Sequence, residues 1–242
     1  MKVYVPGRRV RLFSMLAAGL LAVALVVVLQ PEQARASFPG KNGKILFAST
    51  QITDENPEGD WEIFSMKPDG SGLTQLTSNA VQDRGPTGSP DGEKIAFFSN
   101  RDPAAEGNYD IYVMDADGSD QTSVTEGSAR DLFPAWSPDG RRIAFETQRD
   151  KGTFTDANSE IYAMDANGRN PINLTHDPIA LDSTPAWSPN GRKIAFRSFL
   201  RDSAEETVLD DVIYTMNADG SQQTARTSGF SIDTFPLDWA PL

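Results

Sequence analysis

Residues 134–145 read Pro-Ala-Trp-Ser-Pro-Asp-Gly-Arg-Arg-Ile-Ala-Phe, and parts of this stretch recur along the chain. Copies of the Ile-Ala-Phe triplet stand at 95–97 and 194–196, and Ile-Leu-Phe stands at 45–47. The segment that ends in Ser-Pro-Asp-Gly is matched by residues 185–191 and partly by 86–92 and 236–241. A repeat of this kind decides the fold, because each copy is one structural unit.

A second phrase, Asp-Ile-Tyr-Val-Met-Asp-Ala-Asp-Gly at 110–118, follows each of these triplets. Its partners occupy residues 62–70, 160–168 and 212–220. A threonine stands seven residues after each closing glycine, at Thr77, Thr125, Thr175 and Thr227. The same four phrases therefore recur in one order, about every fifty residues.

Each phrase predicts a short strand or a tight turn. The apolar Ile-Ala-Phe run is typical of a buried strand, and Ile-Tyr-Val-Met is rich in residues that favour strands. Proline and glycine in Ser-Pro-Asp-Gly set the backbone of a turn. We name the four strands of one unit A (ending in Trp), B (Ile-Ala-Phe), C (Ile-Tyr) and D (Thr). Four short strands in each repeat predict an all-β fold, a four-bladed β-propeller of four-stranded antiparallel blades.

The order of the phrases also predicts how the propeller closes. The first unit begins at strand B, near Lys44, and the chain ends after a lone strand A at 235–241. We expect this C-terminal strand A to pair with the first blade and close the ring, because a closed ring leaves no open sheet edge. The alternative is an open half-ring that dimerises into eight blades.

One position departs from the repeat. Gly88 stands in blade two where Trp136, Trp187 and Trp239 stand in the other units. An aromatic ring there would bury a large apolar area. We therefore expect blade two to be the least tightly packed.

Residues 1–36 have the pattern of a signal peptide. A basic start is followed by an apolar run from Leu12 to Leu29 and by the triplet Ala34-Arg35-Ala36. The alternative is an uncleaved N-terminal membrane anchor, because 18 apolar residues nearly suffice to span a bilayer. We expect residues 37–242 to form the propeller in an extracytoplasmic location, secreted or in the periplasm or cell envelope, with no other attachment to a membrane.

Charge and cysteine content restrict the partners. Removing residues 1–36 takes away five basic residues and one acidic residue, which leaves a net charge of −16. Such a chain repels phosphate backbones, so we expect no nucleic-acid partner. The chain has no cysteine, so burial and strand pairing must hold the fold together.

The repeated phrases resemble those of the TolB-type propeller repeats, a WD-like family without the Trp-Asp dipeptide. The resemblance covers essentially all of residues 40–242 and implies a β-propeller. TolB itself has six blades behind a separate N-terminal domain, whereas only four repeats are counted here. The resemblance therefore does not carry over the role of TolB in the Tol–Pal envelope system.

The candidate binding face is the end of the blades where strand B connects to strand C and strand D to the next strand A. We call it the B–C end. Its connections vary in sequence, with the B–C loops expected at 50–60, 99–109, 147–159 and 198–211. Variable loops on a rigid scaffold are where binding usually resides.

A repeated aspartate is the candidate ligand-binding group. It stands three residues before each strand-A proline, at Asp83, Asp131, Asp182 and Asp233. Because strand A is innermost, these carboxylates would form a ring at the mouth of the channel and bind a cation or a basic ligand group. The alternative is structural: each carboxylate accepts hydrogen bonds from backbone N–H groups of its own loop or of the next blade.

Other polar repeats have structural interpretations. The acids that open strand C, Glu62, Asp110 and Glu160, predict a repeated structural hydrogen bond. The Asp-Ala-Asp-Gly turns lack the spacing of an EF-hand calcium loop. The single histidine, His176, is expected to be exposed in a loop. The sequence thus assigns no catalytic residue, metal ligand or cofactor.

These features predict an exported, non-enzymatic binding or scaffold module that engages an envelope or extracellular protein, or a glycan, through its B–C end. The alternative is a small extracellular hydrolase or lyase that acts on polysaccharide through loop carboxylates. A third possibility is a purely structural envelope protein, since a propeller fold alone does not decide function.

Overall fold

The computed structural model describes residues 43–102, 108–127, 129–150, 158–177, 180–201, 208–228 and 237–239. These residues form strands, turns and bends, and no helix among them could cross a membrane. The predicted signal peptide, 1–36, lies outside the described residues.

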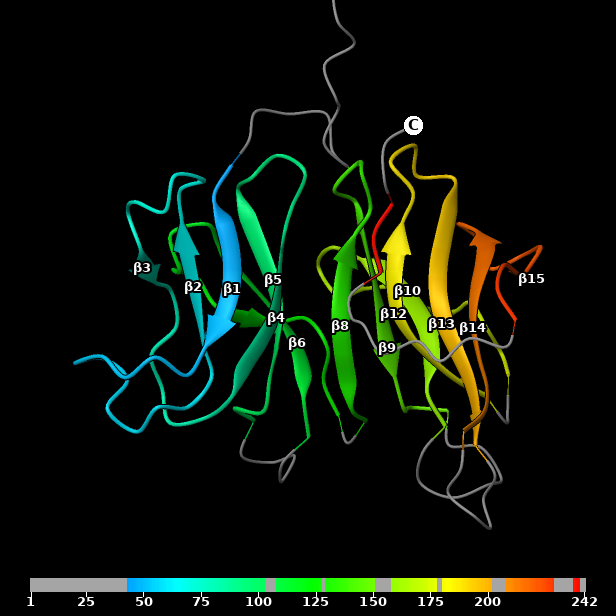
Figure 1. The fold of residues 1–242 in the computed structure, drawn as a ribbon, viewed down its shortest axis with the longest axis horizontal. Coiled ribbons are helices and arrows are strands. Elements are labelled where there is room, and N and C mark those ends of the chain that lie inside the picture. Colours follow the sequence, from blue (N-terminus) through cyan, green and yellow to red (C-terminus); the bar gives the residue numbers. More distant parts are fainter. Residues whose placement is uncertain are drawn as a thin grey trace, which may run out of the picture. The chain divides into compact units, whose positions relative to one another are not determined.

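Fifteen strands form four antiparallel sheets, each made of strands that are consecutive in the chain (Figure 1). Blade one contains β1 (Ile45–Ser49), β2 (Glu62–Met66) and β3 (Thr74–Gln75). Blade two contains β4 (Asp83–Gly88), β5 (Lys94–Ser99), β6 (Asp110–Asp115) and β7 (Thr122–Ser123). Blade three contains β8 (Asp131–Trp136), β9 (Arg142–Thr147), β10 (Glu160–Asp165) and β11 (Ile172–Asn173). Blade four contains β12 (Ala180–Trp187), β13 (Lys193–Arg201), β14 (Val208–Asn217) and β15 (Thr224–Ala225). The predicted all-β, four-bladed propeller is confirmed, and the strands fall on the repeated phrases.

The hydrophobic core lies between successive blades. Strand β4 packs against β1 and β2, β8 against β4, β5 and β6, and β12 against β8, β9 and β10. The Ile-Ala-Phe strands of blades two and three are buried on both faces, as their uninterrupted apolar sequence predicts. Each blade therefore buries its apolar faces only by stacking on its neighbours.

Large and small side chains complement each other at each blade contact. Ala96 of blade two shares a core cluster with Trp136 of blade three, and Ala144 shares one with Trp187 of blade four. The pair is reversed between blades one and two, where Leu46 lies beside Gly88. The leucine of Ile-Leu-Phe thus fills part of the space that Gly88 leaves open.

Blade one has three strands among the described residues instead of the expected four. Strand β1 pairs there only with β2, and of the expected closing strand, 235–241, only 237–239 are described. Trp239 donates its indole N–H to the carbonyl of Ala186 on β12, over 3.0 Å. The C-terminal tryptophan therefore lies against blade four, as Trp187 lies against blade three. Ring closure through β1 stays a prediction.

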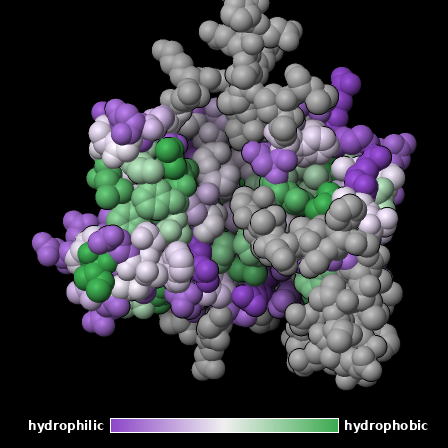
Figure 2. Space-filling view, viewed as in Figure 1, coloured by the Kyte–Doolittle hydropathy of each residue, from purple (hydrophilic) through white to green (hydrophobic). Residues whose placement is uncertain are grey.

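Strand β1, at the edge of the three-stranded sheet, is correspondingly exposed. None of its residues is fully buried, and Ile45 is 42% exposed. Figure 2 shows apolar side chains gathered over this sheet, on the left of the view.

The hairpin of blade four extends beyond its predicted limits. A loop was expected at 198–211, but β13 continues to Arg201 and β14 begins at Val208. Pairing continues from Phe199 with Asp211 as far as Arg201 with Val208, and an Arg197–Asp211 ion pair joins the two strands. That loop prediction was wrong in its bounds.

The glycine of the Asp-Ala-Asp-Gly turn is required for close approach of the blades. A Cβ atom on Gly118, Gly168 or Gly220 would lie 2.2–2.6 Å from the carbonyl oxygen of the residue directly after strand D in the preceding blade. A Cβ atom on Gly70 of blade one would meet no described atom within 4 Å. All four glycines have positive φ.

We therefore expect Gly168→Ala to be more destabilising than Gly70→Ala. Both variants carry the cost of left-handed backbone, about 1–2 kcal/mol. Only Gly168→Ala adds a collision, with the carbonyl oxygen of Val124. Urea unfolding would measure the difference. Equal losses would show that blade one also has a preceding neighbour in solution, as ring closure requires, and the solution mass would then distinguish a closed monomer from a dimer.

The reversed pair of blades one and two predicts a favourable double substitution. Gly88→Trp alone should be destabilising by about 1–3 kcal/mol because the new ring collides with Leu46. Combined with Leu46→Ala, which restores the Ala–Trp pair of the other blades, it should recover most of that loss. A double-mutant cycle in urea would measure the coupling, and strictly additive losses would contradict this packing scheme.

Candidate functional site

The predicted aspartates lie at the contacts between blades. Asp83 and Asp131 begin β4 and β8, and Asp182 is the third residue of β12. All three are at most 2% exposed. Asp233 lies outside the described residues.

Each of these three aspartates joins its blade to the preceding one. The backbone N–H of the aspartate donates to a backbone carbonyl in the preceding blade. The accepting residue stands directly before the acid that opens strand C of that preceding blade. The acceptors are Trp61, Tyr109 and Ser159, at 2.7, 2.8 and 2.8 Å. The aspartates are thus structural in their backbone bonds, whatever their carboxylates bind.

The acid and threonine of the preceding blade complete each contact. Thr77 donates its hydroxyl to Glu62, Thr125 to Asp110 over 3.3 Å, and Thr175 to Glu160. The same hydroxyls accept the backbone N–H of the isoleucine that follows the acid. The predicted structural hydrogen bond of these acids is confirmed. Blade four has Val212 in place of the acid and keeps only the backbone bond, from Ile213 to Thr227 over 2.9 Å.

Two arginines that sequence reasoning missed pair with the aspartates. Arg101 lies 2.5 Å from the carboxylate of Asp83, and Arg149 lies 3.1 Å from that of Asp131. Each guanidinium also stacks on two aromatic rings of its own blade, within 5.3 Å of the ring centroids. The signal was available: an arginine follows two residues after Ser99 and after Thr147, which pair with the aspartates across the sheet.

Blade four differs at this point. Asp182 pairs with Ser198 across the sheet, and Leu200 stands where the arginines stand in blades two and three. Burial raises the pKa of Asp182 to about 7, and the negative charge of Glu160 adds to the shift. Ser198 and Thr175 donate hydrogen bonds that oppose it.

A second buried carboxyl faces the same contact. Glu146 of β9 is 8% exposed, and burial raises its pKa to about 7. The exposed Arg130 and a hydrogen bond from Ser159 oppose this shift, while Asp182 adds to it. Burial likewise raises the pKa of Glu160. We call the polar residues of this contact the blade-three/four cluster: Glu146, Asn158, Ser159, Glu160, Asp182, Ser183 and Thr184.

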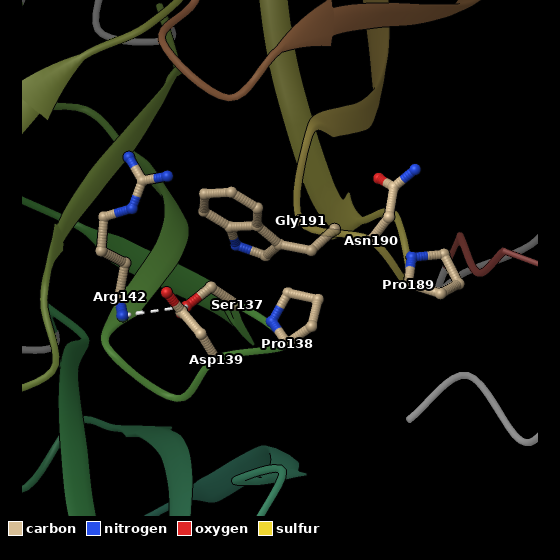
Figure 3. A pocket seen from close by; sticks show the side chains of 8 residues that line it. Ser137, Pro138, Asp139, Arg142, Pro189, Asn190 and Gly191 are labelled. Atoms are coloured by element: carbon tan, nitrogen blue, oxygen red, sulfur yellow. Dashed lines mark hydrogen bonds between the residues drawn. The ribbon is translucent and has the colours of Figure 1, made fainter. Parts of the chain in front are cut away.

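A pocket lies at the opposite end of the same two blades, between their A–B turns (Figure 3). It has a volume of about 280 Å³, and Ser137, Pro138, Asp139 and Arg142 face Pro189, Asn190 and Gly191 across it. The Arg142 guanidinium lies 4.6 Å from the ring of Trp187. The turns that line it are held by a hydrogen bond from Ser137 to Asp139 and from Ser188 to Asn190. Because Ser89 and Asp91 make the same bond in blade two, these residues serve the fold first.

The remaining sequence predictions concern surface groups. His176 is exposed, as predicted. The Asp-Ala-Asp-Gly turns are closed by their own side chains, for instance by Ser119, whose backbone N–H and hydroxyl both donate to Asp117. In the described part of the chain, no three acidic or histidine side chains converge as a metal ion would require.

Comparisons with known proteins agree with this architecture. No protein-family model matches the sequence, and no curated protein is significantly similar to it. The solved structure of the putative TolB from Agrobacterium tumefaciens is 28% identical, with a TM-score of 0.59, and the match covers 76% of this chain and 62% of that one. Hydrazine synthase from Kuenenia stuttgartiensis is 17% identical, with a TM-score of 0.61, over 79% of this chain and 32% of that one. A chain of the nidogen/laminin complex is 12% identical, with a TM-score of 0.56, over 77% of this chain and 62% of that one.

The four stacked antiparallel sheets and these similarities define a β-propeller. Among propellers, the likeness to the putative TolB structure agrees with the resemblance of the repeated phrases to TolB-type, WD-like repeats. It spans less than two thirds of the length of the putative TolB chain.

The raised carboxyl pKa values predict that the protein is more stable at mildly acidic pH. A buried carboxyl with a folded pKa of about 7 and an unfolded pKa of about 4 binds a proton only in the folded state between these values. The unfolding free energy should therefore fall as pH rises from 5 to 7, by up to about 1.4 kcal/mol per pH unit for each such group.

Urea unfolding across this pH range would test the assignment. Glu146→Gln should flatten the fall in stability, and Glu93→Gln, in an exposed turn of blade two, is the matched control. An unchanged profile for Glu146→Gln would contradict the assignment.

Proposed function

We propose that the protein is an exported, non-enzymatic binding module that engages a protein or a glycan of the envelope or exterior through its B–C end. Export is supported by the signal-peptide pattern of residues 1–36. The propeller supplies a rigid scaffold on which binding loops can vary.

The observation that carries this proposal is the difference between the two ends of the blades. At the A–B end, blades two, three and four repeat one turn with one set of hydrogen bonds. At the B–C end each described connection has its own structure. In blade one, buried Asn56 holds the connection through the carbonyls of Gln51 and Asp60, at 3.3 and 2.9 Å. In blade four, the β13–β14 hairpin continues instead, held by the Arg197–Asp211 ion pair at 2.6 Å.

Burial of the unusual carboxyls supports binding rather than catalysis. A glycosidic acid or base must reach the bond that it cleaves. Glu146 and Asp182 have suitably raised pKa values, but they are 8% and 2% exposed and lie between packed blades. To reach either carboxyl, the glycosidic bond of a polysaccharide would have to enter the contact between these blades together with its sugar rings.

A pull-down from the native envelope would test the proposal. The loop variant would carry Gly/Ser in place of residues 103–107 and 151–157. It would spare Arg101 and Arg149, which pair with Asp83 and Asp131. It would also spare Asp150, which accepts a hydrogen bond from Asn173 over 2.8 Å. We expect the wild type to retain a specific protein or glycan that the loop variant loses.

The matched control is Arg141→Ser in the exposed A–B turn of blade three, which should bind as the wild type does. If the wild type and the loop variant retain the same material, the face assignment is wrong. Release of new reducing ends or unsaturated sugars from envelope polysaccharide would instead support the hydrolase or lyase alternative.

A further inference from the structure

The contact between blades three and four is polar where the preceding contact is aromatic. Between blades two and three, the ring of Phe98 lies edge-on to those of Tyr109 and Phe133, with centroids 5.4 Å apart in both pairs. Glu146, Ser159 and Thr184 stand at the equivalent positions one blade later. Three packed rings are thus replaced by three smaller or polar side chains.

Several oxygen atoms of this polar contact have no hydrogen-bond partner in the described structure. They are Glu146 Oε2, Asn158 Oδ1, Asp182 Oδ1, Ser183 Oγ and Thr184 Oγ1. The five residues are at most 8% exposed. Burial of a polar atom without a partner costs about 1–3 kcal/mol. Three of these atoms are amide or carboxylate oxygens, which accept hydrogen bonds, and two are hydroxyl oxygens, which accept and donate them. The five atoms together indicate a ligand that donates several hydrogen bonds.

The two other contacts show which group this position accepts. At Asp83 and Asp131 the chain itself supplies a guanidinium, from Arg101 and Arg149. These arginine side chains remain 21% and 26% exposed while the carboxylates are buried, so the guanidinium position is reached from solvent.

In blade four, Leu200 stands at the position of these arginines. The strands stay paired there, and Leu200 is the partner of Ala180 on β12. Arg201 takes the next position, opposite Val208 of β14. The nearby Arg130 stacks over Tyr109, with its guanidinium carbon 5.5 Å from the ring centroid, on the side of blade two.

We propose that the blade-three/four cluster binds a guanidinium group supplied by a basic peptide segment of a partner protein. A guanidinium has five N–H donors in one plane, which suits several separate acceptors better than the three donors of an ammonium. The net charge of −16 for residues 37–242 attracts a basic partner. The inference rests on the proposed binding function and names the chemistry of its ligand.

The test uses the purified protein and L-argininamide as the probe, with L-lysinamide and sodium chloride at equal ionic strength as comparators. We expect L-argininamide to raise Tm in a saturable way, and to bind at one site in calorimetry. L-lysinamide and salt should have a smaller effect. Asp182→Asn should weaken L-argininamide binding by about tenfold or more, because a hydrogen bond to a charged group is lost.

Two further variants make the test independent of folding defects. Leu200→Arg would supply the guanidinium from the chain, so it should raise Tm and abolish probe binding. Arg149→Leu would remove the partner of Asp131, so it should create a second probe site. Arg201→Gln tests whether the chain's own Arg201 occupies the cluster. If this variant bound L-argininamide and the wild type did not, Arg201 would be the occupant and the proposal would fail.

Two other results would also overturn the proposal. One is no saturable binding of L-argininamide to the wild type. The other is stabilisation by Ca²⁺ with none by L-argininamide, which would make the cluster a metal site. Because this test needs no envelope fraction, it can fail while the envelope pull-down succeeds, and the proposed function would then stand without this ligand chemistry.

Discussion

The rest of the structure depends on the hydrogen bond that crosses from one blade to the next at the start of each inner strand. The N–H of Asp131 donates to the carbonyl of Tyr109 in the preceding blade, and Asp83 and Asp182 repeat this bond. A sheet of four short strands cannot bury both faces by itself, so its stability comes from the neighbouring blades. The crossing bond fixes the height at which they stack, and the apolar clusters between blades follow from that alignment.

The close stacking restricts the side chains differently in two regions of each blade contact. Near the turn after strand C, Gly118 and Gly168 bring their backbone against the preceding strand D, where no Cβ atom fits. Near the inner strands, one large and one small side chain must alternate, and the Leu46–Gly88 pair satisfies this rule in reverse. Both demands concern volume, because protein interiors are close-packed and tolerate neither overlap nor voids.

The repeat predicted the strands, the turns and the acid–threonine bond, because each needs particular residue types at a fixed spacing within one unit. Contacts between units were harder to predict. Arg149 is ordinary in a variable loop, and its pairing with Asp131 appears only when the chain leaves the sheet after Thr147. The compensation of Gly88 by Leu46 also joins positions that are distant in sequence. The bounds of the β13–β14 hairpin were not predicted, because the sequence at 198–211 does not follow the repeat although strand pairing continues into it.

The buried aspartate near the start of the inner strand has different charged neighbours in different blades of this chain. In blades two and three, a guanidinium neutralises the charge of the buried aspartate. At the contact of blades three and four, Asp182 lies near Glu146 and Glu160, so the described groups add negative charge instead. Burial of unpaired charge is costly, and raised pKa values show that part of this cost is avoided by taking up protons. An aromatic contact of the kind made by Phe98, Tyr109 and Phe133 would remove the part of this cost that Glu146 carries. A stacked fold that can use an apolar contact but carries a polar one has its simplest physical explanation in a ligand that supplies the missing donors.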